Sequence, residues 1–441
     1  MILPSVQALL SRQMPGYTLT QGLHLDPDVY RVEIERIWRP AWLFAAHSAE
    51  LRNAGDRTVF DFGDDSVLLV RGQDSSIRAF HNVCRHRGSR LVDATIATLP
   101  GPFGSVAVPT AHAGPAATAG PASRPDFARY TGSGRDAFIR CPYHQWAYHL
   151  DGSLAACGGM DRTEGFDAAA HGLVQVEIAE VSGLVFVRVE AAPEPGPGGT
   201  QPNIHELAEP LLPQGLERAK LAHQESYVVD AGWKVVWENN RECWHCHAGH
   251  PEYIRSNFDT ANTASPEVRR RMASRTASMI SALSGLSAGN VFEGGGLAAF
   301  PSPGHAWSSH RTPLAEGFAT ESLDGAPVAP LMGDYKSYDV GVLRVRALPN
   351  FWCHACADHA VTTRLAPAGV EATEVVVTWL VDQDAVEGRD YSLETLLPVW
   401  ARTSEQDWEL CERNQRGIRS SGYRPGPLSP RHEANVAAST E

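Results

Sequence analysis

Residues 84–88 read Cys-Arg-His-Arg-Gly, and residues 141–144 read Cys-Pro-Tyr-His. Each stretch follows a short alternating run that predicts a strand, so each places one thiolate and one imidazole on a tight loop. Two cysteines with two histidines are the ligand set of a Rieske 2Fe–2S centre, in which two His replace two Cys on one iron. The two stretches together offer Cys84, His86, Cys141 and His144.

A tetrahedral Cys2His2 zinc site is the alternative use of the same side chains. Zinc fingers open with two closely spaced cysteines and close with a histidine pair, whereas here each loop is mixed. Arg85, Arg87 and Pro142 also crowd the loops in a way that a zinc site would not be expected to show. The spacing therefore favours the Rieske centre, whose raised reduction potential suits it to accept electrons from a flavin-type donor.

The surrounding pattern predicts the domain organisation. Short alternating runs punctuated by turns fill about 55–190 and predict a small antiparallel β domain. Residues 97–136 are rich in Ala, Gly, Pro, Thr and Ser, and we expect a flexible insertion there. A Pro/Gly-rich stretch at 190–203 predicts a linker. We expect an N-terminal helical segment at 1–50, a Rieske domain at 51–190, a linker at 191–205 and a catalytic domain at 206–441. The N-terminal segment is expected to pack on the catalytic domain.

A second group of potential ligands lies at 237–251, which reads Trp-Glu-Asn-Asn-Arg-Glu-Cys-Trp-His-Cys-His-Ala-Gly-His-Pro. We expect a helix, on which Glu242, His245 and His250 share one broad half. Two imidazoles and a carboxylate with open positions form the facial triad of non-haem Fe(II) oxygenases. A helix with ordinary hydrogen-bonded histidines is the alternative. His247 also competes as a ligand because it lies one turn before His250, and spacing alone leaves the pair open.

The carboxylate is expected from the amphipathic helix predicted for 390–418. Asp407 falls on its less charged stripe with Trp400 and Cys411, whereas Glu409 points to solvent. A buried carboxylate needs a partner, and a metal ion is one such partner. An Asp paired with a buried Arg is the alternative.

Two cysteine pairs invite a zinc-ribbon interpretation. Cys243 and Cys246 have the right spacing, as do Cys353 and Cys356, but more than 100 residues separate the pairs, far more than in a ribbon. We therefore expect buried thiols.

The composition excludes some classes of protein. Lys and Arg total 38 against 51 Asp and Glu, a formal net charge of −13, which argues against nucleic-acid and anionic-membrane binding. No stretch reaches the apolar length of a membrane span, and the first residues do not read as a signal peptide. Eight cysteines are too few for a disulfide scaffold. We expect a soluble, cytoplasmic protein.

With both groups of ligands identified, the chain resembles the catalytic α subunit of the Rieske non-haem iron oxygenases from about residue 25 to 430. The resemblance is carried by NVCRHRGSRL with CPYHQWAYHLDG, by GWKVVWENNRECWHCHAGHP and by TSEQDWELCERNQRGI. It implies an α+β fold: a small antiparallel β Rieske domain followed by a helix-grip-like catalytic domain with a central antiparallel sheet and flanking helices. The gap between the cluster loops, at 87–140, is longer than is usual in the family.

The resemblance also implies roles for individual residues. Glu242 matches the bridging carboxylate, more often Asp, which links the mononuclear iron to the Rieske histidine of a neighbouring subunit. The implied iron ligands are His245, His250 and Asp407, in preference to His247. The implied cluster ligands are Cys84, His86, Cys141 and His144.

The same resemblance implies cofactors and partners. Each chain would hold one Rieske 2Fe–2S cluster and one mononuclear Fe(II), and the chains would form a homotrimer. A separate ferredoxin-type reductase with flavin and its own 2Fe–2S centre would supply electrons from NAD(P)H.

Within the family, ENNRECWHC, PNFWCHACADHAVTTRL and WLVDQDAVEGRDY most resemble the glycine betaine monooxygenase group. This implies oxidative N-demethylation of a quaternary ammonium compound by O2, with glycine betaine giving dimethylglycine and formaldehyde. Phe351 and Trp352 are candidates for an aromatic cage around the ammonium, and the other substrate-binding residues are unassigned. The alternatives are stachydrine, carnitine or choline as substrate, ring hydroxylation of an aromatic acid, an electron-transfer protein without catalysis, and a zinc-stabilised interaction protein.

Overall fold

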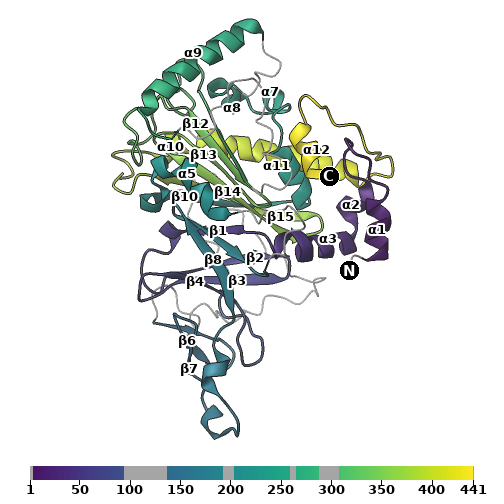
Figure 1. Ribbon diagram of the computed structural model, residues 1–441, viewed down its shortest axis with the longest axis vertical. Coiled ribbons are helices and arrows are strands. Elements are labelled where there is room, and N and C mark those ends of the chain that lie inside the picture. Colours follow the sequence, from purple (N-terminus) through teal and green to yellow (C-terminus); the bar gives the residue numbers. More distant parts are fainter. Residues whose placement is uncertain (1–2, 94–136, 192–202, 259–264, 288–306, 441) are drawn as a thin grey trace, which may run out of the picture. The chain divides into compact units, whose positions relative to one another are not determined.

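The computed structural model describes residues 3–93, 137–191, 203–258, 265–287 and 307–440 (Figure 1). The predicted flexible insertion at 97–136 lies outside these ranges, as does most of the predicted linker. The described chain forms two compact units. The larger unit comprises Met1–Phe44, Val181–Gly183 and Ala191–Glu441, and the smaller unit comprises Ala45–Glu180 and Leu184–Glu190.

The smaller unit is built on two sheets. The first has six strands in the order β1-β9-β8-β4-β3-β2, and the second has three in the order β5-β6-β7. Apolar residues of β3 are fully buried in the first sheet, as expected for β-branched and aliphatic side chains on a packed face. The strands are β1 (Leu43–His47), β2 (Arg57–Phe62), β3 (Asp65–Arg71), β4 (Ile77–His81), β5 (Phe138–Arg140), β6 (Ala147–His149), β7 (Leu154–Ala156), β8 (Gln175–Val181) and β9 (Leu184–Arg188).

One apolar cluster joins the two sheets of the smaller unit. It combines Phe80 of β4 with Tyr148 of β6, and it includes both Cys84 and Cys141. The two loops that carry these cysteines are therefore anchored in the same core.

The N-terminal segment is only partly helical. Its helices are α1 (Pro4–Leu10), α2 (Gln21–Leu25) and α3 (Pro27–Glu33), the last capped by Asp26, whose side chain accepts a hydrogen bond from the Asp28 amide. The prediction of helix over 1–50 is wrong at Leu43–His47, which forms the fully buried strand β1. A short, continuously apolar run fits a buried strand as well as a helix, so its periodicity does not distinguish them.

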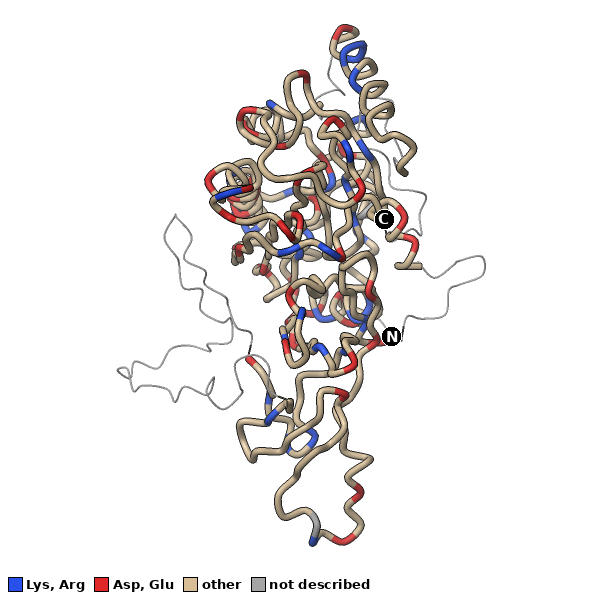
Figure 2. Tube along the Cα trace, turned by 90° about the vertical axis from the view of Figure 1, so that its left-hand side faces the viewer, with Lys and Arg blue, Asp and Glu red and all other residues tan. Residues whose placement is uncertain are grey.

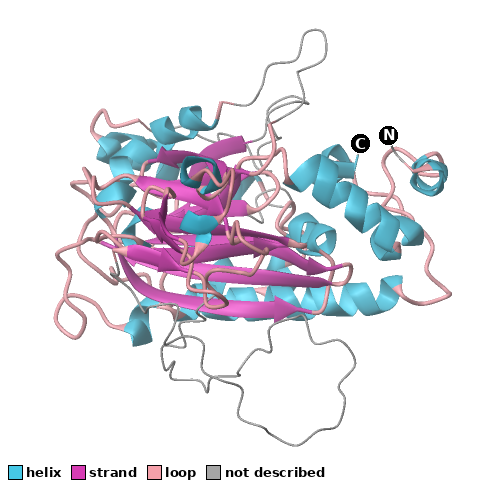
Figure 3. Ribbon diagram, turned by 90° about the horizontal axis from the view of Figure 1, so that it is seen from below, coloured by secondary structure: helices cyan, strands magenta, loops and turns pink. Residues whose placement is uncertain are grey.

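The larger unit contains a six-stranded antiparallel sheet in the order β10-β15-β14-β13-β12-β11. Its strands are β10 (Lys220–Val229), β11 (Trp307–Thr312), β12 (Val342–Ala347), β13 (Phe351–Ala355), β14 (Ala360–Gly369) and β15 (Ala372–Val381). Its further helices are α5 (Ala208–Leu211), α6 (Trp233–Asn239), α7 (Cys246–Gly249), α8 (Pro251–Ser256), α9 (Pro266–Leu283), α10 (Leu393–Leu396), α11 (Pro398–Ile418) and α12 (Ala434–Thr440). Figure 3 shows helices lying along the outside of the sheets.

Side-chain contacts fix α6 between α3 and α11. Glu33 of α3 forms an ion pair with Lys234 and accepts a hydrogen bond from the Trp233 indole at 2.9 Å. On the other side, the Gln415 side chain of α11 accepts a hydrogen bond from the Gly232 amide at 3.1 Å. The turn that follows α6 carries Glu242, so these contacts position one of the predicted functional residues.

The α+β fold class is confirmed, with a small antiparallel β unit and a larger unit in which helices flank an antiparallel sheet. None of the helices in the described ranges is long and apolar enough to cross a membrane. Figure 2 shows acidic and basic residues interspersed along the chain.

Glu238 on α6 predicts a pH-dependent stability. Burial raises the pKa of Glu238 from its ordinary value of 4.5 to about 7. The positive charge of Lys234 lowers this pKa, whereas the negative charge of Glu33 raises it further. The folded state therefore binds more protons than the unfolded state between these pH values, and the free energy of unfolding falls as pH rises from 4.5 to 7, by up to about 3 kcal/mol.

Urea unfolding at several pH values measures this slope, and Glu238→Gln is expected to flatten it. An unchanged slope in the variant would contradict the assignment to Glu238.

Candidate metal centres and active site

The two cluster loops have the same local construction. The Gly88 amide donates to the Cys84 carbonyl at 3.0 Å, and the Gln145 amide donates to the Cys141 carbonyl at 3.1 Å. Gly88 has φ 74° and Gln145 has φ 61°, so each loop closes through a left-handed residue four positions after its cysteine. Glycine takes this conformation without strain, which accounts for Gly88 in Cys-Arg-His-Arg-Gly.

The structure brings the four predicted cluster ligands together. Cys84 and Cys141 are 2% and 1% exposed, whereas His86 is half-buried and His144 is exposed. The two imidazole rings lie 4.7 Å apart between centroids, and His86 stacks on Trp146. Two thiols and two imidazoles gathered in one place are the ligand set that would hold a Rieske cluster.

Two further observations in the smaller unit fit a cluster. His86 Nδ1 is buried without a hydrogen-bond partner in the described chain, which suits an atom reserved for a metal. The Tyr148 hydroxyl lies 3.3 Å from Cys84 Sγ and accepts a hydrogen bond from the Arg85 amide at 3.0 Å. Hydrogen bonds to cluster sulfurs tune the reduction potential of such centres.

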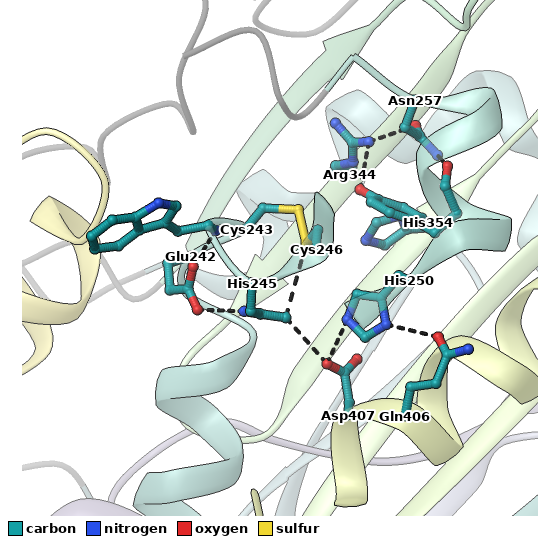
Figure 4. Close-up of a disulfide and its surroundings, with 12 residues drawn as sticks. Glu242, Cys243, His245, Cys246, His250, Asn257, Arg344, His354, Gln406 and Asp407 are labelled. Atoms are coloured by element: carbon teal, nitrogen blue, oxygen red, sulfur yellow. Dashed lines mark hydrogen bonds and ion pairs between the residues drawn. A yellow bond between two sulfur atoms is a disulfide. The ribbon is translucent and has the colours of Figure 1, made fainter. Parts of the chain in front are cut away.

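In the larger unit the predicted iron ligands also converge (Figure 4). Asp407 Oδ1 lies 3.3 Å from His245 Nε2 and 2.9 Å from His250 Nε2. The His250 side chain is 1% exposed, and those of His245 and Asp407 are about one-fifth exposed. Two imidazoles and one carboxylate thus point to a common position, which is the ligand set of a facial triad.

The histidines do not lie on one helix, so the prediction of a continuous helix over this stretch is wrong. Helix α6 ends at Asn239, a turn carries Glu242, and His245 and His250 flank the one-turn helix α7. Pro251 then starts α8 because proline is accommodated in the first turn of a helix. The breaks bring two histidines five residues apart to one point, which a straight helix does not do.

Each imidazole is oriented through its other nitrogen. His245 Nδ1 contacts Glu242 Oε1, and the other Glu242 oxygen accepts a hydrogen bond from the Trp244 amide. His250 Nδ1 lies 2.9 Å from Gln406 Oε1. Both contacts favour a proton on Nδ1, which leaves the lone pair of Nε2 for a metal ion.

The electrostatics of the site favour a cation. Burial lowers the pKa of His245, but the nearby carboxylates of Asp407 and Glu242 outweigh it and raise the pKa to about 10. His250 Nε2 and Asp407 Oδ1 are nevertheless buried without a properly directed hydrogen bond in the described chain. A divalent metal ion would satisfy all three ligand atoms, so the residues fit mononuclear iron.

The remaining candidates are placed elsewhere. His247 is exposed, while Cys243 and Cys246 form a disulfide, so the prediction of buried thiols is wrong for this pair. Cys246 Sγ lies close to His245 and His250, but as a disulfide sulfur it cannot serve as a thiolate ligand in this state.

The cage candidates are also core residues in the structure. Phe351 is fully buried and packs on Phe44, and Trp352 is buried near Trp237.

Sequence reasoning missed a buried polar and aromatic cluster beside His250. The Tyr253 ring lies 6.4 Å from that of His250, and its hydroxyl accepts a hydrogen bond from Arg344 at 2.9 Å. Glu321 accepts hydrogen bonds from Asn257 at 2.9 Å and from the Trp400 indole at 3.0 Å. No local motif marks these residues, because they come from α8, α11, β12 and a loop far apart in sequence.

The cluster holds a buried negative charge. Burial raises the pKa of Glu321, but the neighbouring His354 ring and the Arg344 guanidinium outweigh it and bring the pKa to about 2. Glu321 is therefore ionised at neutral pH although it is 1% exposed.

Comparison with known proteins identifies the family. Residues 41–102 match the Rieske [2Fe-2S] domain, and residues 216–441 match the catalytic domain of the ring hydroxylating alpha subunit. The glycine betaine monooxygenase oxygenase subunit of Chromohalobacter salexigens is 34% identical over 438 residues, which cover 97% of this chain and 85% of that protein. The chain belongs to the Rieske non-haem iron oxygenases.

Two other proteins share a smaller fraction of identical residues with this chain. The carnitine monooxygenase oxygenase subunit of Escherichia coli K12 is 29% identical over 249 residues, 54% of this chain and 53% of that protein. The crystal structure of a quaternary ammonium Rieske monooxygenase in complex with L-carnitine has a TM-score of 0.63 at 19% identity, covering 100% of this chain and 97% of the other.

As a Rieske oxygenase, the protein is an enzyme that uses a Rieske 2Fe–2S cluster and a mononuclear iron. The resemblance inferred from its motifs is thereby confirmed, and the closest group inferred from them agrees with the Chromohalobacter relative. His245, His250 and Asp407, which converge in Figure 4, all lie within the residues that match the catalytic domain.

Replacing Asp407 is expected to release the mononuclear iron and to leave the cluster intact. In Asp407→Ala, iron per chain should fall by about one third, with acid-labile sulfide and the visible spectrum of the cluster unchanged. Glu409→Ala is the matched control, since Glu409 is an exposed carboxylate of the same helix. Full iron content in Asp407→Ala would exclude this carboxylate as a ligand.

Proposed function

We propose that the protein is a monooxygenase that N-demethylates a quaternary ammonium compound, with glycine betaine as substrate and dimethylglycine and formaldehyde as products. The observation that carries the proposal is the convergence of His245, His250 and Asp407, in a chain that matches a glycine betaine monooxygenase subunit over 97% of its length. Two imidazoles and one carboxylate leave positions open for O2.

The metal ligands are part of the proposal. We assign the mononuclear iron to His245, His250 and Asp407, and the cluster to Cys84, His86, Cys141 and His144. The distances and the buried, unpartnered nitrogens described above support both assignments. When bound, the iron would supply the activation of O2 with electrons from the cluster, so that an N-methyl group would be oxidised and its carbon released as formaldehyde.

Glu242 is proposed as the electron bridge between subunits. Its contact with His245 Nδ1 connects it to the iron site, and the exposure of His144 makes that imidazole accessible to a neighbouring chain. In a homotrimer, Glu242 would meet His144 of the partner subunit. This shortens the electron path, and it explains why a carboxylate is placed at this turn.

A cationic substrate is supported by the cluster beside His250. The rings of Tyr253 and Trp400, whose centroids lie 5.7 Å apart, supply aromatic faces of the kind that stabilise a quaternary ammonium. The carnitine relative makes carnitine the second candidate, although it aligns with only about half of this chain. Choline, stachydrine and aromatic acids are weaker alternatives.

The enzyme also needs an electron donor. We propose a separate flavin- and 2Fe–2S-containing reductase that uses NAD(P)H, docking by local charged patches because the chain is acidic overall. The cytoplasmic location expected from the sequence stays a prediction.

Glycine betaine turnover tests the substrate directly. The cluster is reduced anaerobically and the reductant is removed, after which glycine betaine and O2 are added. Formaldehyde and dimethylglycine are expected in equal amounts and in proportion to mononuclear iron. Carnitine, choline, stachydrine and an aromatic acid serve as parallel substrates, and product from one of these but not from glycine betaine would replace the proposed substrate.

Glu242→Gln tests the bridge. We expect both metal centres to remain loaded and reoxidation of the cluster by substrate and O2 to slow by about ten-fold or more, as is typical when a partner of a metal-bound histidine is removed. Glu409→Gln is the control. Unaltered reoxidation with full iron would rule out a bridging role.

A further inference from the structure

A disulfide closes the turn that carries His245, and the function proposed above does not use it. Cys243 and Cys246 are joined across this turn, which is also held by a hydrogen bond from the Cys246 amide to the Cys243 carbonyl at 3.3 Å. Cys243 is half-buried, whereas Cys246 is 5% exposed and faces the metal site. Cys243 is therefore the more exposed residue of the pair.

Cys246 is within reach of the metal position. Its Sγ lies 3.9 Å from His245 Nε2, and the ligand atoms of His245, Cys246 and His250 all lie within 4.8 Å of one another (Figure 4). Nitrogen and sulfur ligands of one tetrahedral zinc ion lie about 3.6 Å apart, given the usual metal–ligand distances. Rotation of a released Cys246 side chain would cover the small remaining difference.

We propose that Cys243 and Cys246 form a thiol–disulfide switch that changes the ligand set of the mononuclear metal site. With the disulfide intact, the site offers His245, His250 and Asp407. With the disulfide reduced, the Cys246 thiolate joins these ligands. The inference rests on the proposed iron ligands but not on the identity of the substrate.

The reductant is a dithiol. One of its thiolates attacks Cys243 Sγ, the bond between the two cysteine sulfurs breaks, and Cys246 leaves as a thiolate that takes up a proton or binds the metal. The second thiol of the reductant then displaces Cys243, which also becomes a thiol. The dithiol loses two electrons and two protons and closes to a cyclic disulfide, so electrons and atoms balance.

The added thiolate has two consequences. It occupies a position that a facial triad leaves open for O2, and it makes the site softer, which favours zinc over iron. With the disulfide formed, the site therefore binds iron and keeps a position open for O2. With the disulfide reduced, the Cys246 thiolate occupies that position.

Cobalt substitution tests the ligand change without any assay of activity. The mononuclear iron is exchanged for Co²⁺ in the full-length protein, and X-ray absorption is recorded at the cobalt edge, which the cluster iron does not obscure. Only nitrogen and oxygen neighbours are expected in the oxidised protein. After reduction with a dithiol and its removal, about one sulfur neighbour per cobalt is expected. Alkylation and mass spectrometry establish whether the disulfide was reduced.

Three variants make the outcome specific. Cys243→Ala leaves Cys246 as a permanent thiol and should give the sulfur neighbour without reductant, whereas Cys246→Ser should never give it. Cys157→Ser, which removes a half-buried free thiol of the smaller unit, should behave like the unaltered protein. Full alkylation of both cysteines without a sulfur neighbour would overturn the switch and leave the proposed function standing. Loss of cobalt binding in Asp407→Ala tests the ligand assignment separately.

Discussion

The convergence of three candidate ligand atoms on one point is the constraint on which the site of the larger unit depends. Asp407 Oδ1 lies 3.3 Å from His245 Nε2 and 2.9 Å from His250 Nε2. Lone pairs brought so close repel unless a proton or a metal ion lies between them. The packing of α11 against α6 and α8 must hold this arrangement, and the Gln415 contact with Gly232 and the Gln406 contact with His250 are two of its ties.

The imidazoles of His245 and His250 have different hydrogen-bond partners at Nδ1, which suits them to different roles. His250 is almost fully buried, and its Nδ1 meets a neutral amide, Gln406, which in turn donates to Glu252. His245 is more exposed, and its Nδ1 meets a carboxylate. A carboxylate strengthens the basicity of the imidazole it contacts and gives a charged route to the metal, which suits the proposed bridge.

The smaller unit combines buried cysteine sulfurs with an exposed histidine at the proposed cluster site. The buried Cys84 and Cys141 belong to the same apolar core that joins its two sheets. His144, by contrast, is exposed. Sulfur that is shielded from solvent and imidazole that is open to a partner allow electrons to pass without exposing the cluster as a whole.

The sequence alone predicted the fold class and the family and offered two groups of candidate metal ligands, because these depend on residue types at short spacings within a loop or along one helix stripe. Asp407 could be selected from its neighbours in this way, since burial along a helix follows its periodicity. The breaks between α6, α7 and α8 could not be foreseen, because the tertiary contacts that bend the chain there outweigh local helical preference. The Gln406 partner of His250 and the cluster around Glu321 were decided only by the tertiary structure, which brings together side chains that lie as many as 156 residues apart. The disulfide joins cysteines only three positions apart, but residue type and spacing alone do not say whether they pair.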